Sequence, residues 1–225
     1  MRQGGKRKST VAWIVVWNVV SWFAAPGTLW GEEGSDEKDF QTLVQEDSLE
    51  GWEGDTKWFR VEGGEVIAGS LEREIPHNFF LCTRRSYENF ELRLEAKLLG
   101  TGDNAGIQFR TAKIPDSHEV SGYQADMGTA WDRPVWGALY DESRRNRMLA
   151  EGDREVVAQA LRKEDWNAIV VRCEGSRVQI WLNGQRTVDY TEPEPQISRS
   201  GVIALQIHGG PPAEARYRKV RIQEL

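Results

Sequence analysis

The chain has 225 residues and a formal net charge of −6, which leaves room for one ordinary domain with an appendage or for two small domains. Nucleic-acid-binding proteins normally carry a clustered basic face, so this acidic balance argues against a nucleic-acid partner. Ten tryptophans are many for this length, but tryptophan serves both in protein cores and on sugar-stacking surfaces, so the count alone assigns no function.

The N-terminus has the pattern of a secretory signal. A basic head, MRQGGKRKST, precedes an apolar run from Val11 to Ala25 that only Asn18 and Ser21 interrupt. The run is shorter than the roughly 20 apolar residues of a membrane-spanning helix, and small residues that permit cleavage follow it. We therefore predict a signal peptide over residues 1–27, a periplasmic or extracellular protein, and no stable membrane span after signal removal. An uncleaved N-terminal anchor is the alternative.

The segment GEEGSDEKD, residues 31–39, is acidic, contains glycine and lacks apolar residues. Such a composition is typical of a linker. We predict a linker over residues 28–39 and a single folded domain over residues 40–225.

Cys82 and Cys173 are the only cysteines of the chain, so one disulfide is possible but a disulfide framework is not. Cys173 lies on the apolar side of an alternating run that also contains Ile169 and Val171. We favour two buried free thiols over a bridge.

From Phe40 onward the chain contains short runs in which apolar and polar residues alternate, with turn signals between them. The clearest runs are ELRLEAKL (91–98), AGIQFR (105–110), NAIVVRC (167–173), RVQIWLNG (177–184), GVIALQIHGG (201–210) and YRKVRIQEL (217–225). Asn183-Gly184 favours a tight turn that needs positive φ, and only residues 153–163 suggest either a short helix or a loop. This pattern predicts an all-β domain, an antiparallel sandwich or jelly roll.

Three predicted strands carry ligand-binding residue types on their polar faces. Alternation places on these faces the pairs Gln108 and Arg110, Gln124 and Asp126, and Gln206 and His208. A sheet face in bulk water usually carries Lys, Glu, Thr and Ser, so we predict a polar groove here. A solvated sheet face is the alternative, and a single β-bulge would reverse the facing of these residues.

His208, beside a Gly-Gly turn, can act as an acid or base near neutral pH, although such a histidine can also be structural. The run from Tyr140 to Arg145 (YDESRR) places carboxylates beside guanidinium groups, which suit carboxylates or sugar hydroxyls. The sequence contains no zinc-binding motif, so we predict no cofactor. A calcium site built from Asp126, Asp141 and backbone carbonyls is the remaining metal alternative.

The order of the sequence blocks carries a family resemblance. Between Leu49 and Leu225 the chain contains, in order, LCTRRSYENFELRLEAKL, NAGIQFRT, GYQADMG, WGALYDESRRNRML, DWNAIVVRCEG, VQIWLNGQRTVDYTE, GVIALQIHGGP and YRKVRIQEL. Together these resemble the DUF1080 family of 3-keto-disaccharide hydrolase domains, and GYQAD with LYDESRR resembles a secreted subgroup from planctomycete-type bacteria. The resemblance implies a concanavalin A-like jelly roll of two antiparallel sheets with a sugar site on its concave face. It also implies hydrolysis of glycosides whose sugar is oxidised at C3.

Such a reaction has a plausible acid–base route. A ketone at C3 acidifies the C2 proton, so a base can remove it and expel the C1 substituent, after which water adds to the enone. We assign Asp126 or His208 to proton transfer and Arg110 to the developing oxyanion. Tyr140 and Asp141 are expected to bind sugar hydroxyls or to protonate the leaving group. The candidate substrate-binding residues are Gln108, Gln124, Tyr140, Arg144, Gln206 and Trp136. Whether Trp131 and Trp136 stack on sugar or fill the core is left open.

The chain departs from the family pattern in two places. Many relatives read N-S-G-I and G-Y-E-x-Q where this chain has NAGI (104–107) and GYQAD (122–126). If the glutamate is the base in those relatives, this chain must use Asp126 or be inactive there. A non-catalytic, lectin-like carbohydrate-binding module is therefore the main alternative function, because jelly rolls host both functions.

Overall fold

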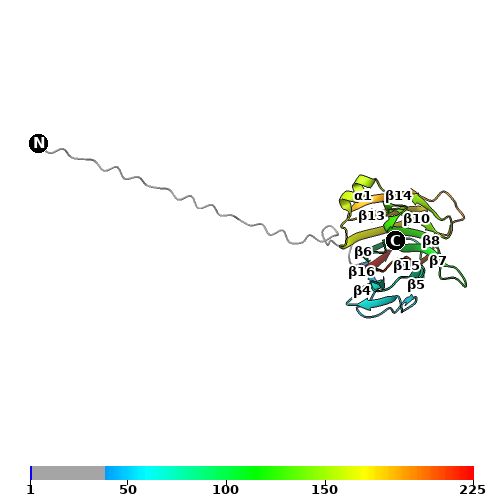
Figure 1. The fold of residues 1–225 in the computed structure, drawn as a ribbon. Helices are drawn as coiled ribbons and strands as arrows, with labels where there is room; N and C mark the ends of the chain where they lie inside the picture. The colour runs from blue at the N-terminus through cyan, green and yellow to red at the C-terminus, as the bar shows by residue number, and fades with distance from the viewer. Residues whose placement is uncertain (2–38) are drawn as a thin grey trace.

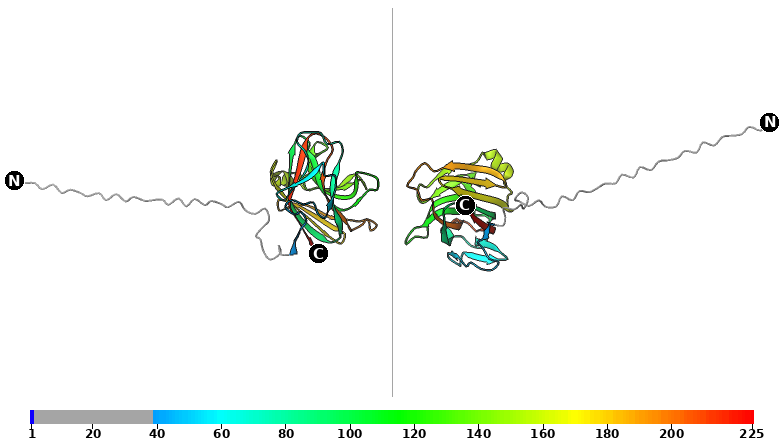
Figure 2. Two further views of the ribbon diagram at one scale, coloured as in Figure 1. Left: turned by 90° about the horizontal axis from the view of Figure 1, so that it is seen from below. Right: turned by 180° about the vertical axis from the view of Figure 1, so that it is seen from behind.

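The computed structural model describes Met1 and residues 39–225, which form two eight-stranded sheets packed face to face (Figures 1 and 2). Apart from Met1 and Asp39, the predicted signal peptide and linker lie outside the described residues. Among the helices of the described part, none has the length and hydropathy to cross a membrane.

The first sheet contains, in spatial order, β14 (Gln185–Thr191), β13 (Arg177–Leu182), β12 (Asn167–Glu174), β6 (Phe90–Gly100), β16 (Ala213–Glu224), β4 (Glu65–Ser70) and β3 (Phe59–Glu62), while β1 (Gln41–Thr42) pairs with β16. The second sheet contains β11 (Arg147–Ala150), β10 (Leu139–Glu142), β8 (Val120–Ala130), β7 (Asn104–Lys113), β15 (Gly201–Ile207), β5 (Phe79–Tyr87) and β2 (Trp52–Glu53), while β9 (Arg133–Pro134) pairs with β8. All these strand pairs are antiparallel. The predicted all-β jelly-roll sandwich is confirmed.

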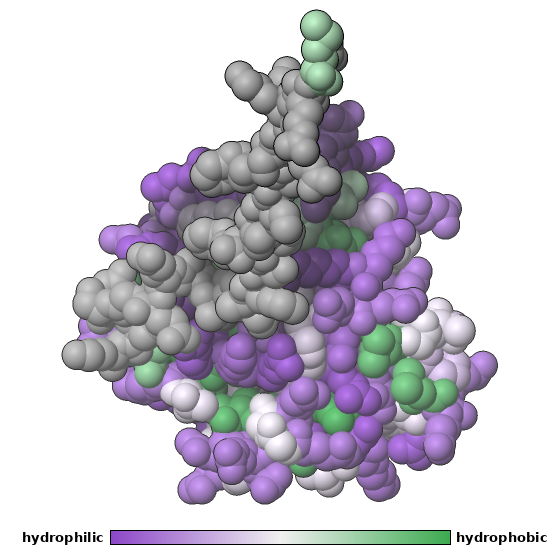
Figure 3. Space-filling view, turned by 90° about the vertical axis from the view of Figure 1, so that its left-hand side faces the viewer, coloured by the Kyte–Doolittle hydropathy of each residue, from purple (hydrophilic) through white to green (hydrophobic). Residues whose placement is uncertain are grey.

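The core lies between the sheets and follows the predicted alternation. From the first sheet, β6 and β12 contribute Leu92, Leu94 and Ile169, all fully buried. From the second sheet, β7 and β15 contribute Ile107 and Leu205 in the same way. Each such aliphatic side chain stabilises the fold by about 1.5–3 kcal/mol relative to an exposed position. The surface is mostly hydrophilic where Figure 3 shows it, with only scattered apolar side chains.

The two cysteines are buried and free, as predicted. Cys173 lies in the main core, whereas Cys82 lies in a small apolar cluster with Phe80 and Ala204. Burial raises the pKa of Cys82 to about 11 and that of Cys173 to about 12. Both groups therefore remain thiols at neutral pH.

Two local predictions are also resolved. Residues 153–163 contain α1 (Arg154–Ala160), which begins where the Asp153 side chain accepts hydrogen bonds from the backbone N–H groups of Glu155 and Val156. Asn183 and Gly184, with φ of +47° and +82°, turn the chain from β13 into β14.

Candidate functional site

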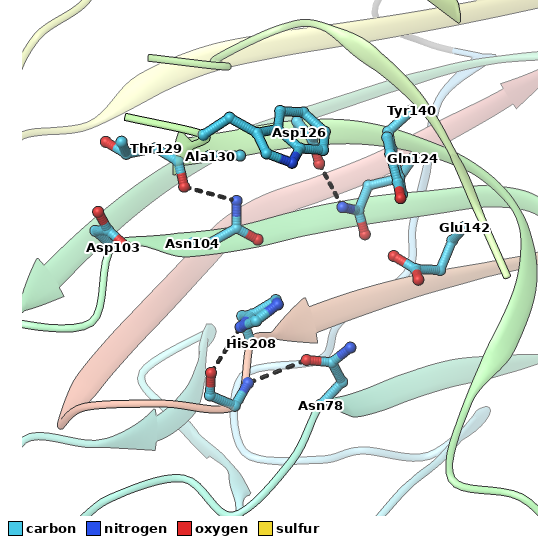
Figure 4. A pocket seen from close by; sticks show the side chains of 12 residues that line it. Asn78, Asp103, Asn104, Gln124, Asp126, Thr129, Ala130, Tyr140, Glu142 and His208 are labelled. Carbon is cyan, nitrogen blue, oxygen red and sulfur yellow. Dashed lines mark hydrogen bonds between the residues drawn. The ribbon is translucent and has the colours of Figure 1, made fainter. Parts of the chain in front are cut away.

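A cleft of about 380 Å³ opens on the face of the second sheet that is turned away from the core, which we call the cleft face (Figure 4). Strand β8 supplies Gln124 and Asp126, and β10 supplies Tyr140 and Glu142. Gln124 pairs in register with Tyr140. Residues paired across antiparallel strands project from the same face, so these side chains converge on one cleft.

Asp126 is the deepest carboxyl group of the cleft. Its side chain is 3% exposed and accepts a hydrogen bond from Nε2 of Gln124. Gly106 lies opposite Asp126 in the register and makes room for Gln124, since a Cβ at Gly106 would lie 2.4 Å from Cδ of Gln124. Among the described residues that line the cleft, none is a lysine or an arginine. Asp126 therefore has an amide partner instead of a cationic one.

Burial raises the pKa of Asp126 to about 7, against the lowering effect of the Gln124 hydrogen bond and with a further rise from the charge of Glu142. Burial likewise raises the pKa of Glu142 to about 7, with the charge of Glu119 adding to the rise. The pKa of Tyr140 is also raised, by burial and then by the charges of Glu142 and Asp126. The cleft thus holds two carboxyl groups that change protonation near neutral pH, a property typical of acid–base sites.

His208 occupies the opposite wall from Asp126 and Gln124 (Figure 4). Its Nδ1 lies 2.6 Å from the carbonyl oxygen of Gly209. A carbonyl oxygen only accepts, so this hydrogen-bond pattern assigns the proton to Nδ1 and leaves Nε2 of the neutral ring as an acceptor. Asn78 fixes this wall, because its Oδ1 accepts from the backbone N–H of Gly209 at 3.0 Å.

An aromatic pair forms the rim of the cleft. Trp131 is 61% exposed, and its ring centroid lies 5.9 Å from that of Tyr140. Trp131 and Asp132 form the turn between β8 and β9, with φ of +50° and +59°. Left-handed backbone at a bulky residue is unfavourable and tends to occur at functional positions. In contrast, Trp136 is 8% exposed and packs in the core, which excludes the predicted contact with sugar in this cleft.

The structure moves Arg110 away from the cleft. The register of β7 and β8 is interrupted between Phe109 and Ala112, and Arg110 has a φ of +48°. This bulge turns the guanidinium group toward two turns at the end of the sandwich. There it donates to the carbonyl oxygens of Glu88 and Gly175 at 2.7–2.9 Å. The predicted oxyanion contact is therefore wrong, because the extra residue reverses the facing of Arg110.

We expect Arg110→Met to destabilise the domain by about 2–4 kcal/mol, because the hydrogen bonds from a buried charged donor to the carbonyl oxygens of Glu88 and Gly175 would be lost. Urea unfolding measures the loss, with Arg84→Met as the control at an exposed arginine that pairs with Glu53 at 3.6 Å. Loss of activity without loss of stability would instead return Arg110 to the cleft.

Asp141 and Arg144 also lie outside the cleft. Asp141 pairs in register with Tyr123, a core residue, and therefore projects from the opposite face to Tyr140 and Glu142. It is 0% exposed and forms ion pairs with Arg144 and Arg145. The predicted catalytic role of Asp141 and the predicted substrate contact of Arg144 are corrected to a buried ionic cluster.

Asp126 and Asp141 project from opposite faces of one sheet, so they cannot both coordinate one calcium ion, and the predicted calcium alternative is excluded. In the described part of the chain, no three acidic, histidine or cysteine side chains are grouped so as to hold a metal ion.

Gln108 and Gln206 lie on the cleft face but beneath its surface. Gln108 is buried and donates from Nε2 to Oε1 of Gln124 at 2.5 Å. Gln206 is buried, with neither amide atom in a protein hydrogen bond. Neither residue lines the cleft, so neither side chain is placed for the direct contact with substrate that was predicted.

The sequence reasoning missed Glu142, Asn78 and Asn104, which all line the cleft. Glu142 was detectable, because it follows Tyr140 by two residues and therefore shares its face. Asn78 and Asn104 stand at strand ends, where alternation gives no signal.

Fold and cleft together define a jelly-roll domain with a candidate acid–base site on the face of one sheet that is turned away from the core. The chain belongs to the family of 3-keto-alpha-glucoside-1,2-lyase-like domains, whose model matches residues 39–223. No curated protein matches the sequence.

Solved structures with this fold include glycosyl hydrolase-like and carbohydrate-binding proteins. A candidate glycosyl hydrolase from Parabacteroides distasonis superposes with a TM-score of 0.62 at 18% identity, covering 84% of this chain and 96% of its own. The carbohydrate-binding module CBM66 from Bacillus subtilis gives 0.54 at 14% identity, covering 83% and 96%. The lumenal domain of VIP36, bound to Ca²⁺ and Man3GlcNAc, gives 0.57 at 12% identity, covering 82% and 88%. At these identities the likeness establishes the fold alone.

Proposed function

We propose that this protein cleaves glycosides whose sugar carries a ketone at C3, by removal of the C2 proton and elimination of the C1 substituent. Asp126 carries the proposal. It is a buried carboxyl group with a pKa of about 7, held by an amide and open to a cleft that contains further acid–base groups. A base for this step must be ionised near neutral pH and shielded from bulk water, and Asp126 meets both requirements.

In the proposed reaction the Asp126 carboxylate takes the C2 proton, and the electron pair of that bond forms an enolate with the C3 oxygen. When the enolate collapses, the C3 carbonyl reforms, a double bond forms between C1 and C2, and the C1–O bond breaks. Tyr140 and the neutral form of Glu142, which line the same cleft from β10, serve the enolate oxygen as donors. His208, on the opposite wall, serves the departing oxygen as the general acid. Water then adds across the double bond and gives the 3-keto sugar.

The decisive experiment uses 3-keto-glycosides, the corresponding ordinary glycosides, and a 3-keto-glycoside deuterated at C2. We expect turnover of the 3-keto substrates alone, with a primary isotope effect on kcat. Equal turnover of both glycoside classes without an isotope effect would contradict the elimination and favour ordinary hydrolysis.

A lectin-like module remains the second candidate, because the pair of exposed Trp131 and half-buried Tyr140 is also suited to binding sugar without chemistry. CBM66 and the mannoside-bound VIP36 domain share the fold. Saturable binding of a glycoside with no turnover of its 3-keto form would favour this candidate.

In the proposed reaction, Trp131 contacts the leaving group at the rim of the cleft. We expect Trp131→Ala to raise KM by about 5–30-fold, the loss of about 1–2 kcal/mol of stacking, with kcat nearly unchanged. Trp131→Phe keeps an aromatic surface and should retain most of the affinity. A fall in kcat with KM unchanged would contradict a purely binding role.

We further infer from the basic and apolar N-terminal pattern that the protein acts after export. N-terminal sequencing of protein recovered from the periplasm and medium tests this, and an intact N-terminus in the cytoplasmic fraction would contradict it.

A further inference from the structure

A chain of hydrogen bonds leads from Asp126 into the floor beneath the cleft. Nε2 of Gln108 donates to Oε1 of Gln124 at 2.5 Å. Oγ1 of Thr111 lies 3.2 Å from Oε1 of Gln108, and the carbonyl oxygens of Phe109 at 3.1 Å and Tyr123 at 3.4 Å are alternative acceptors for its one proton. Nε2 of Gln124 then donates to Oδ1 of Asp126. All four side chains are buried, so bulk water does not replace these partners.

Two glycines make room for this chain. A Cβ at Gly106 would lie 2.4 Å from Cδ of Gln124, and one at Gly122 would lie 2.3 Å from Oγ1 of Thr111. The bulge that removes Arg110 from the cleft face also places Thr111 there, because the register resumes one residue later. The local backbone therefore suits all three buried polar side chains.

The donor-to-acceptor direction of these hydrogen bonds determines which protonation state of Asp126 they support. A carboxylate only accepts hydrogen bonds, so Gln124 supports ionised Asp126 when its Nε2 faces the carboxylate. A glutamine amide that is free to turn presents its oxygen as readily, and an oxygen beside the carboxylate would oppose ionisation. The donor from Gln108 engages Oε1 of Gln124 and thereby holds Nε2 toward Asp126. Thr111 supports Gln108 more weakly, because its hydroxyl also has the carbonyl oxygens of Phe109 and Tyr123 as acceptors.

We propose that Gln108 and Thr111 are positioning residues that hold the Gln124 amide in the orientation that supports the ionised form of Asp126. Neither touches the cleft, so they act only through Gln124. The kinetic consequence rests on the proposed function, because Asp126 must be ionised to remove a proton.

The charged and titratable groups around Asp126 come from three other elements. Glu142 and Tyr140 face it from β10, Asp103 precedes β7, and His208 follows β15. Gln108 is uncharged, so its replacement by another neutral residue leaves all four in place. A shift in the titration of Asp126 would therefore report the orientation of Gln124 rather than a changed charge.

The test is Gln108→Met, which preserves length and removes both polar atoms. We expect the acidic limb of the kcat/KM profile to move up by about one pH unit, equivalent to a loss of up to about tenfold at pH 6, with the alkaline limb left where it is in wild type. Titration of the Asp126 carboxyl carbon by NMR, without substrate, should show the same shift. Thr111→Ser keeps the hydroxyl and should leave both readouts unchanged.

An equal loss of activity at all pH values, with the NMR midpoint of Asp126 unchanged, would overturn the proposal and leave Gln108 a structural residue. If wild type turns over no 3-keto-glycoside, the proposed function fails, but the NMR titration still decides the positioning role. If Gln108→Met does not fold, Thr111→Val replaces it, with a smaller upward shift expected and an unchanged midpoint as the contradicting result.

Discussion

Replacing Asp126 with asparagine is expected to reduce turnover of 3-keto-glycosides by at least about 10²–10⁴-fold, the usual contribution of a general base. Asparagine keeps the shape and the contact with Gln124 but cannot accept the C2 proton. Wild-type kcat/KM should follow a bell-shaped pH profile with its maximum near pH 7, because Asp126 must be ionised and Glu142 must be neutral, and burial raises the pKa of each to about 7. Pre-steady-state and steady-state assays across this range measure both effects.

The same substitution is expected to stabilise the fold at alkaline pH. Folding raises the pKa of Asp126 from 3.8 to about 7, so the native state holds a proton that the unfolded state releases. The contribution of Asp126 to stability is therefore most favourable below pH 4 and declines as pH rises, with the decline complete above about pH 7. The shift corresponds to at most about 4 kcal/mol. We expect Asp126→Asn to recover about 2–4 kcal/mol at pH 8 and little at pH 4 in urea unfolding.

Retention of full turnover by Asp126→Asn would move the base to His208, and His208→Ala then becomes the diagnostic variant. A variant less stable than wild type at pH 8 would show instead that the Asp126 carboxylate is favourably solvated in the native cleft.

Asp141→Asn is expected to have the opposite pair of effects, a large loss of stability and unchanged turnover per folded molecule. Asp141 is 0% exposed and contacts Arg144 and Arg145, and Arg145 also pairs with Glu192 and Glu194. Removing one partner of a buried ion pair typically costs about 3–5 kcal/mol, because the remaining charges lose their compensation.

Differential scanning calorimetry should show a fall in Tm of roughly 6–20 °C for a domain of this size. Asp189→Asn is the matched control, since Asp189 pairs with Arg177 and Arg186 on the surface and should change Tm little. Loss of activity in Asp141→Asn without loss of stability would return Asp141 to the reaction.

The fold followed from the sequence because alternation is a property of each strand. Leu92, Leu94 and Ile107 have period-two spacing, and the same spacing placed Gln124 and Asp126 on the cleft face. Asp141 was assigned to the site because it is a carboxylate beside arginines. Its position two residues after Leu139, a core residue, already placed it on the opposite face of β10 from the cleft.

Other features could not be read from the chain in this way. The bulge at Arg110 has no glycine to signal it, since arginine itself adopts the left-handed conformation there. Trp131 is exposed and Trp136 is buried because of the way the segment between β8 and β10 folds across the sheet, which residue alternation does not predict. The depth of Asp126, which sets its pKa, depends on side chains from several strands and is a tertiary property.

The bulge at Arg110 has a further consequence for comparing this domain with other sandwiches. A related strand without the extra residue has the opposite inside–outside assignment at every position after Phe109. A gapless alignment through this strand would equate Arg110 with a residue facing the ligand and Thr111 with one facing the core. Correspondences between such proteins must therefore be drawn from strand pairing, such as that of Thr111 with Val202, rather than from position in the alignment.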